Sequence, residues 1–228
     1  TDETTKGYAS LYAAYDEQCQ REGVVDFAEL LLRCYELLAR NEILREHYSQ
    51  RFRYILVDEF QDTNRLQYRW LKLLSGHPRP PQAGGSLVFA VGDDDQSIYT
   101  FRGANVGNMA DFERDFKVRN VVRLEQNYRS HGNILDAANA LISNNRNRLG
   151  KNLWTSAGKG EPLRVFEGES DNDEARWLVE EVEALARDGT RLSQIGVLYR
   201  SNAQSRVVEH ALFSRGIPYR VYGGLRFF

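Results

Sequence analysis

The stretch Tyr54-Ile-Leu-Val57 runs directly into Asp58-Glu59-Phe60-Gln61-Asp62, and this change from apolar to polar residues decides the fold. Four consecutive apolar residues between polar neighbours are typical of a short strand that is buried on both faces of a parallel sheet. A helix is predicted to follow, over about residues 64–75. The sequence therefore predicts a strand, a polar turn and a helix in succession.

The same order of elements recurs twice further along the chain. Leu87-Val-Phe-Ala-Val91 precedes Gly92-Asp93-Asp94-Asp95-Gln96, and Val121-Val-Arg-Leu124 precedes Glu125-Gln-Asn-Tyr128-Arg129. Each of these pairs is followed by a predicted helix, over about residues 106–115 and 132–144. Strands that alternate with helices predict an α/β fold with a parallel sheet. Ligands of such sheets bind beyond the carboxyl ends of the strands, where all three polar turns are expected to lie.

Helical periodicity dominates the residues before this repeat. Helices are predicted over residues 4–21, 26–39 and 41–50. Asp26 is the predicted N-cap of the second helix, because Glu29 follows it at the spacing of a capping box. Residues 75–86 hold three of the five prolines and predict a mobile loop.

A polar, glycine-containing stretch at residues 144–161 separates this region from a second one. Beyond it the pattern restarts, with strands predicted at residues 163–166, 195–199 and 218–222 and helices over residues 172–187 and 201–214. We therefore expect a second α/β domain, and we place the boundary near residues 148–152.

The composition is that of an ordinary globular protein, with 42% hydrophobic and 27% charged residues among 228. It excludes a disordered chain and a collagen-like chain, and no apolar run is long enough to predict a transmembrane helix. The net charge of −2 argues against nucleic-acid binding by bulk basicity alone. Two cysteines that form no CxxC pair favour a reduced, cytoplasmic protein. Because the chain begins with Thr and its one methionine is Met109, we expect it to be a piece of a longer protein.

Four stretches of the sequence resemble, in order, signature motifs of the UvrD/PcrA/Rep family of superfamily 1 DNA helicases. They are LVDEFQDTN at residues 56–64, VGDDDQSIYTFRGA at residues 91–104, LEQNYRS at residues 124–130 and IGVLYRSNAQSR at residues 195–206. The resemblance covers nearly the whole chain. It implies a partial RecA-like motor core, with the end of a helical insert at residues 1–22, the first motor domain at 23–148 and the start of a second at 149–228.

The resemblance also implies roles in ATP hydrolysis for individual residues. Asp58 would coordinate Mg²⁺, and Glu59 would be the base that activates the attacking water. Gln96 would sense the γ-phosphate of ATP. Tyr128 would stack on the adenine, and Arg129 would be an arginine finger on the γ-phosphate. Phosphoryl transfer depends on positioning and charge neutralisation, so it requires this combination of a metal carboxylate, a water-orienting group and a cation.

A second set of residues would contact DNA. By the same resemblance, Tyr99 and Phe101 would stack against single-stranded bases, and Arg102 would lie between them and the nucleotide site. Aromatic stacking holds any base without selecting sequence, as a translocating motor requires. The implied cofactors are ATP and Mg²⁺. The implied partners are single-stranded DNA, junctions of single- and double-stranded DNA and possible repair proteins, with no membrane.

The phosphate loop, GxxxxGK[ST], and the C-terminal helicase motifs are absent from this sequence. The resemblance therefore implies an ATP-dependent 3′–5′ helicase of DNA repair as the parent, and an isolated piece that does not hydrolyse ATP. Two other readings remain open: a helicase subunit of a RecB/AddA-like helicase–nuclease, and a non-catalytic DNA-binding homologue.

Overall fold

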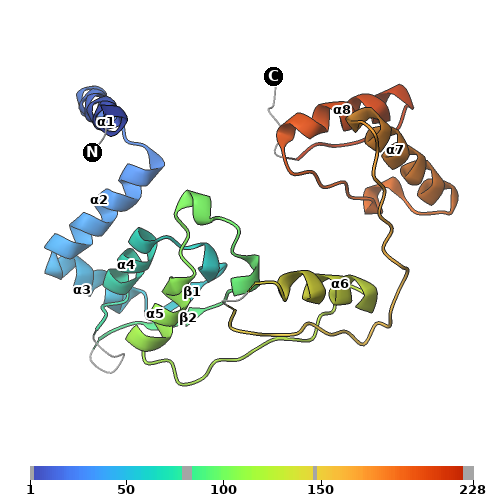
Figure 1. Ribbon diagram of the computed structural model, residues 1–228. Coiled ribbons are helices and arrows are strands. Elements are labelled where there is room, and N and C mark those ends of the chain that lie inside the picture. Colours follow the sequence, from blue (N-terminus) through green and yellow to red (C-terminus); the bar gives the residue numbers. More distant parts are fainter. Residues whose placement is uncertain (1–2, 79–83, 146–147, 223–228) are drawn as a thin grey trace. The chain divides into compact units, whose positions relative to one another are not determined.

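The computed structural model describes residues 3–78, 84–145 and 148–222 (Figure 1). The chain divides into two compact units, Thr1–Gly160 and Glu161–Phe228, which are described separately below. The predicted boundary at residue 149 lies inside the first unit, and the division into two motor domains stays a prediction. Residues 79–83 of the predicted loop lie outside the described residues.

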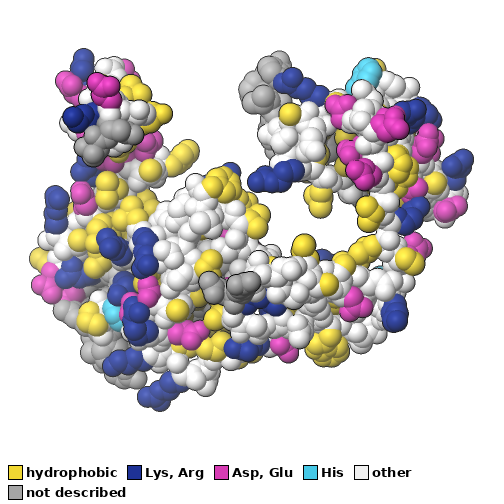
Figure 2. Space-filling view, in the orientation of Figure 1, with side chains coloured by type: hydrophobic (Ala, Val, Ile, Leu, Met, Phe, Trp, Pro, Cys, Tyr) yellow, Lys and Arg dark blue, Asp and Glu magenta, His cyan; other side chains and the backbone are white. Residues whose placement is uncertain are grey.

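The first unit begins with three helices, α1 (Glu3–Glu22), α2 (Phe27–Arg40) and α3 (Glu42–Arg51), which confirm the three predicted ones. The Asp26 side chain caps α2 by accepting the Glu29 N–H at 2.8 Å, as its position in the sequence predicts. Asn41 ends α2 and caps α3 by accepting the Leu44 N–H at 3.0 Å. Helix α2 packs against α3 and against the later helix α4 (Arg65–Leu74), whereas α1 buries none of its side chains. Apolar side chains are consequently exposed over α1 and α2 (Figure 2).

Two strands form the sheet, β1 (Tyr54–Val57) and β2 (Leu87–Ala90). They are parallel, with Tyr54 opposite Leu87 and Val57 opposite Ala90, and helix α4 (Arg65–Leu74) lies in the connection between them. Asn64 and Gln67 close a reciprocal capping box at the start of α4. The first two predicted strands and the parallel arrangement are thus confirmed.

The core of this unit lies on one face of the sheet. Its buried side chains come from the turn after β1, from α4 and from helix α5 (Gly107–Asp115), and they are Phe60, Tyr68, Leu71 and Phe112. Alternate strand residues pack on this cluster, while Leu56 and Phe89 of the other face are exposed. The prediction that these strands are buried on both faces is therefore wrong for the described structure, because the core covers only one face.

The third predicted strand, residues 121–124, is not a strand in the structure. Val122 and Leu124 are exposed, and the first backbone pairing comes after them, where Gln126 bridges Trp154. An apolar run becomes a strand only when a neighbouring backbone satisfies its N–H and C=O groups, and no neighbour pairs with residues 121–124 in the described part of the chain. Helix α6 (Gly132–Ile142) follows as predicted.

The second unit is built on two packed helices, α7 (Asp171–Arg187) and α8 (Asn202–Ser214), which confirm the predicted ones. Ser170 and Ser201 cap them. The prediction of three strands in this unit is wrong, for the same reason as at residues 121–124. Residues 163–166, 195–199 and 218–222 are irregular and pair with no other backbone among the described residues. Leu198, for example, is 99% exposed.

None of the helices in residues 3–78, 84–145 and 148–222 is long and apolar enough to cross a membrane.

Candidate functional site

The turn after β1 carries the two acids that the sequence singles out. Asp58 and Glu59 are both exposed, and one Asp58 carboxylate oxygen accepts the Glu59 N–H at 2.9 Å. Glu59 has a left-handed backbone, with φ 48° and ψ 45°, which residues other than glycine seldom adopt. Such a conformation costs about 1–3 kcal/mol, persists where the surroundings enforce it, and is concentrated at functional sites. The strained backbone therefore marks Glu59 as a candidate for chemistry.

Gln61 joins the ends of the two strands. Its side chain is 1% exposed and lies in the short 3₁₀ helix Phe60–Asp62. The Gln61 amide donates to the Glu59 carboxylate at 2.7 Å, and its carbonyl oxygen accepts the Asp93 N–H at 2.9 Å. The Phe60 N–H also donates to the Val91 carbonyl at 3.0 Å. The turns after β1 and β2 are thus fixed to each other.

Gly92 leaves the space in which this connection is made. A Cβ atom at Gly92 would lie 2.9 Å from the Gln61 side-chain oxygen and 3.3 Å from the Gln61 backbone nitrogen. Gln61 is buried, and its side-chain oxygen is held by the Asp93 N–H, so these atoms have little room to move. The strand end therefore requires glycine for close approach.

The turn after β2 continues the hydrogen-bonded chain to Gln96. The short 3₁₀ helix Asp94–Gln96 places the Gln96 amide to donate to the Asp93 carboxylate at 2.6 Å. Burial alone would raise the pKa of Asp93, but hydrogen bonds from Lys151 and Gln96 outweigh it and lower the pKa below its usual value. An unbroken series of contacts thus connects Glu59, Gln61, Asp93 and Gln96.

The three predicted DNA-contacting residues lie together. The Tyr99 and Phe101 rings are 6.1 Å apart, and the Arg102 guanidinium lies 4.9 Å from the first ring and 5.4 Å from the second. Phe101 is 72% exposed. Gly103, with φ 87°, ends the short helix Thr100–Arg102 that presents them. The cluster offers a cationic, aromatic surface on which an unpaired base could stack.

Tyr128 and Arg129 lie on a separate turn, which Asn127 builds. The Asn127 side-chain oxygen accepts the N–H groups of both Arg129 and Ser130 at 2.8 Å. Tyr128 is 84% exposed and donates its hydroxyl to Gln126 at 2.9 Å. Among the described residues, no contact joins Arg129 to Glu59 or Gln96. The structure therefore brings together the residues of the first two turns, whereas those of the third do not contact them directly.

Asp58 is suited to the Mg²⁺ that the resemblance implies. Its carboxylate is exposed at a strand end, and within the described part of the chain it accepts a hydrogen bond only from the Glu59 backbone. Mg²⁺ is commonly held by one or two carboxylates together with water and substrate phosphates, so a single exposed Asp fits this requirement.

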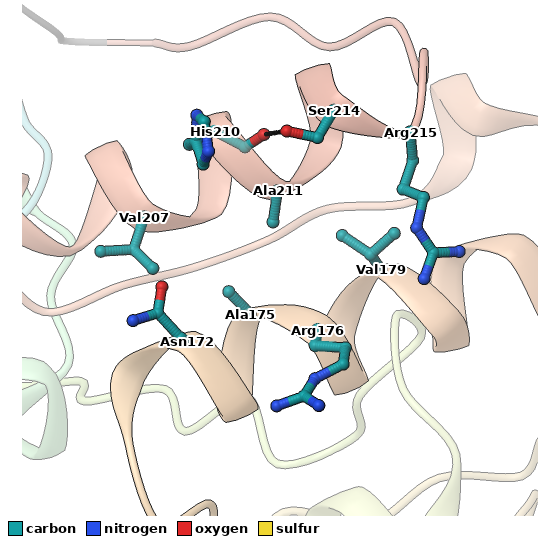
Figure 3. Close-up of a pocket in the computed structure, with 9 residues that line it drawn as sticks. All are labelled: Asn172, Ala175, Arg176, Val179, Val207, His210, Ala211, Ser214 and Arg215. Carbon is teal, nitrogen blue, oxygen red and sulfur yellow. Dashed lines mark hydrogen bonds between the residues drawn. The ribbon is translucent and has the colours of Figure 1, made fainter.

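A separate pocket lies between α7 and α8 in the second unit, with a volume of about 140 Å³. Figure 3 shows small apolar side chains, among them Ala175 and Ala211, between the two helices, with His210 and Arg215 nearby. Arg215 is paired with Glu183 at 3.1 Å. None of the residues predicted for the site lines this pocket.

Two residues that support the site were missed by the sequence reasoning. Gln61 lies inside the quoted stretch LVDEFQDTN but was assigned no role, although a Gln two residues after Glu59 could have suggested a partner for its carboxylate. Asn108 is fully buried and donates to the Thr63 carbonyl at 2.9 Å, which fixes α5 to the turn after β1. Nothing in the sequence distinguishes Asn108 from an exposed helical Asn.

Two family models match the chain. The UvrD/REP helicase N-terminal domain matches residues 1–117, and the UvrD-like helicase C-terminal domain matches residues 122–228. Together they cover almost every residue.

The chain is also similar to several curated proteins. It is 49% identical to DNA helicase II of Haemophilus influenzae over 100% of its own length and 52% identical to that of Escherichia coli over 97%. It is 41% identical to the ATP-dependent DNA helicase UvrD1 of Mycobacterium tuberculosis over 100% of its length. In each case it spans 30% of the relative. The family models, which match in order along the sequence, show that this chain belongs to the UvrD-like DNA helicase family.

Proposed function

We propose that this chain is part of a cytoplasmic ATP-dependent DNA helicase that couples ATP hydrolysis to 3′–5′ movement along single-stranded DNA and to duplex unwinding in DNA repair. The observation that carries the proposal is the hydrogen-bonded series from Glu59 through Gln61 and Asp93 to Gln96. It connects a candidate base at one strand end to a candidate phosphate sensor at the next.

In this proposal the first turn performs the hydrolysis. Asp58 would hold Mg²⁺, which when bound would neutralise charge on the phosphates, and Glu59 accepts a proton from the attacking water. The hydrogen bond from Gln61 orients the Glu59 carboxylate, so that little reorganisation is required when the reaction takes place. A positioned general base contributes about 10²–10⁴ to the rate.

The second turn connects the nucleotide to DNA. Gln96 and Tyr99 are three residues apart, so a displacement of Gln96 by the γ-phosphate would be passed along a short segment to the aromatic pair. The strength with which Tyr99 and Phe101 hold a stacked base would then depend on the position of Gln96. Arg102 adds a positive charge beside the two rings. The short covalent distance between sensor and grip supports coupling between hydrolysis and movement.

The third turn completes the nucleotide site in the proposal. Tyr128 stacks on the adenine, and Arg129 stabilises the charge on the γ-phosphate. A cation in this position can increase the rate of hydrolysis by about 10³–10⁵. Both side chains are exposed and thus accessible to a ligand. We further propose that residues 23–148 and 149–228 belong to two motor domains, and that this chain alone does not hydrolyse ATP.

The DNA part of the proposal is tested by Phe101→Ala in the complete gene product that contains this chain. Loss of one stacking ring should weaken single-stranded DNA binding by about 1–3 kcal/mol in fluorescence anisotropy, at fixed salt. Phe101→Trp, which keeps a stacking face, should retain the affinity and serves as the matched control. An unchanged affinity in Phe101→Ala would contradict the stacking role.

The ATP part is tested by two measurements of phosphate release. The complete gene product should hydrolyse ATP faster when single-stranded DNA is added, whereas the 228-residue chain should not hydrolyse it. Hydrolysis by the chain alone would refute its predicted inactivity. A complete gene product without DNA-stimulated hydrolysis would refute the helicase proposal and favour the non-catalytic binding homologue.

A further inference from the structure

A single short segment binds all three acids of the turn after β2. Arg148 forms two parallel hydrogen bonds with the Asp95 carboxylate, at 2.8 and 2.7 Å. The Leu149 N–H donates to Asp94 at 2.7 Å, and the Lys151 ammonium pairs with Asp93. Residues 148–151 thus supply one partner for each consecutive carboxylate.

These ion pairs are largely shielded from solvent. The side chains of Arg148 and Asp95 are 15% and 12% exposed, and Arg148 also donates to the Lys151 carbonyl at 3.0 Å, which closes the segment around the pair. Paired charges with this degree of burial are screened by salt less than those on an open surface. A bidentate Arg–carboxylate pair also restricts geometry more than a single contact does.

The three acids require such partners. One carboxylate oxygen from each of Asp93, Asp94 and Asp95 lies within 4.8 Å of the other two. Without the two cations, three like charges would repel one another and would also repel the phosphates of an approaching nucleotide. Gln96 hydrogen-bonds to Asp93, so any movement of the acids changes its position.

The same segment continues to the turn that carries Tyr128 and Arg129. The Trp154 N–H donates to Glu125 at 3.0 Å, and the Asn127 N–H donates to Trp154 at 2.7 Å. The Gly132 N–H donates to the Gly158 carbonyl at 2.8 Å. Residues 148–158 therefore contact the turn with Gln96 at one end and the turn with Arg129 along the rest.

We propose that residues 148–158 form a strap that holds these two turns in register, and that Arg148 and Lys151 are positioning residues for Gln96. The acids lie in the stretch that the N-terminal family model matches, and the strap lies in the C-terminal one. The strap thus connects the two family domains next to the nucleotide site. This inference rests on the function proposed above.

The first experiment tests the strap without ATP, by hydrogen exchange of the 228-residue chain. In Arg148→Ala, the amide of Leu149 should exchange about tenfold faster than in wild type, because loss of the Arg148–Asp95 pair frees the segment that places the Leu149 N–H against Asp94. Lys151→Met keeps the apolar part of the side chain and removes its charge. It is measured in the same way and replaces Arg148→Ala if that variant does not fold. Arg65→Ala removes the exposed pair with Asp111 and is the matched control, with no change expected at Leu149. Unchanged exchange in both strap variants overturns the inference.

The second experiment measures steady-state ATP hydrolysis by the complete gene product. Arg148→Ala should raise KM for ATP about tenfold and lower kcat less, since an uncompensated carboxylate then lies next to Gln96 in the turn that would meet the nucleotide phosphates. Arg148→Lys should recover part of the affinity. Asp95→Asn added to Arg148→Ala should return KM to within about threefold of wild type, because it removes the unpaired charge.

A merely structural role would lower the amount of folded enzyme without changing KM, and Asp95→Asn would then give no recovery. That result overturns the positioning role. The two proposals can also fail separately. If the strap variants change hydrogen exchange but the wild-type gene product hydrolyses no ATP, the strap inference stands and the proposed function is refuted.

Discussion

The turns after β1 and β2 differ in construction from the turn at residues 127–130. Gln61 fixes the first two to each other through buried side-chain hydrogen bonds, and Gly92 leaves room for them. The third turn is shaped by one of its own residues, Asn127, and its functional side chains are exposed. The first two turns are thus interlocked at the strand ends, whereas the third is joined to the rest of the site through backbone hydrogen bonds with residues 148–158.

This difference matches the two tasks that we propose. A group that takes part in a chemical step benefits from a rigid position, because preorganised polar groups need not rearrange as charge develops. A group that engages a nucleotide when a cleft closes must instead remain accessible. We therefore expect changes to the contacts among Glu59, Gln61 and Gly92 to act mainly on kcat, and changes to the Asn127 contacts beneath Tyr128 to act more on KM.

Glu59→Gln should have the largest effect. It removes the proposed base while retaining an oxygen that can accept the Gln61 hydrogen bond, so ATP hydrolysis by the complete gene product should fall by about 10²–10⁴ in kcat. Nucleotide binding, measured by equilibrium fluorescence with a labelled analogue, should change little. A kcat near that of wild type would show that Glu59 is not the base.

Gly92→Ala tests whether the interlock itself matters. The added Cβ would displace Gln61, which should destabilise the chain by about 1–3 kcal/mol in urea unfolding. In the complete gene product it should lower kcat by about 10², the effect of a misplacement near 1 Å. Gly7→Ala is the control, because nothing lies within 4 Å of its added Cβ. Equal effects in both variants would contradict the steric argument.

Asn127→Ala should have a smaller effect, and on a different constant. Loss of two local hydrogen bonds should raise KM for ATP about fivefold, equivalent to about 1 kcal/mol, and should lower kcat through Arg129 by less than the Gly92→Ala change does. Asn127→Asp keeps an acceptor oxygen and should behave like wild type. A fall in kcat as large as that of Gly92→Ala would remove the distinction between the two regions.

Asp115→Asn, at the end of α5 where it contacts α4, should have the smallest effect. A hydrogen bond from Lys72, with others from Tyr68 and Arg114, lowers the pKa of Asp115 from 3.8 to about 2. A carboxylate with a lowered folded-state pKa contributes stability above about pH 4, and that contribution is lost as the pH falls toward 2. Urea unfolding of wild type should therefore lose stability over this range through Asp115, by about 1 kcal/mol or less after solvent screening.

The Asp115→Asn variant should lack that part of the pH dependence while keeping its stability at pH 7 within about 1 kcal/mol of wild type. Identical acid profiles for the two proteins would show that the ion pair does not contribute.

Local signals predicted the helices, because their determinants lie within the helices themselves. Asp26 and Ser201 are examples of caps that can be read from a few neighbouring residues. Strands at residues 121–124 and 195–199 were predicted wrongly, since an apolar run records only the tendency to pair, and pairing requires another segment. The sequence also predicted that both faces of β1 and β2 are buried, whereas one face is exposed. The reason is related, because burial depends on which other elements pack against the sheet.

The candidate site was predictable residue by residue, but its connections were not. Asp58, Glu59 and Gln96 could be selected because they follow apolar runs inside recognisable motifs. The link through Gln61 depends on side-chain direction and on the absence of a Cβ at Gly92, which spacing along the sequence does not contain. The partners of Asp93–Asp95 come from residues more than 50 positions later, so no local pattern could have identified them.

The left-handed backbone at Glu59 has a consequence for protein engineering. Asparagine adopts this conformation more readily than glutamate and keeps a side-chain acceptor oxygen for the buried Gln61 amide, so Glu59→Asn should relieve strain that the native residue maintains. A selection for heat resistance alone would therefore favour loss of the carboxylate on which turnover is proposed to depend. Position 59 is thus a point at which thermal robustness and activity select opposite residues, and libraries designed to raise melting temperature should hold it fixed.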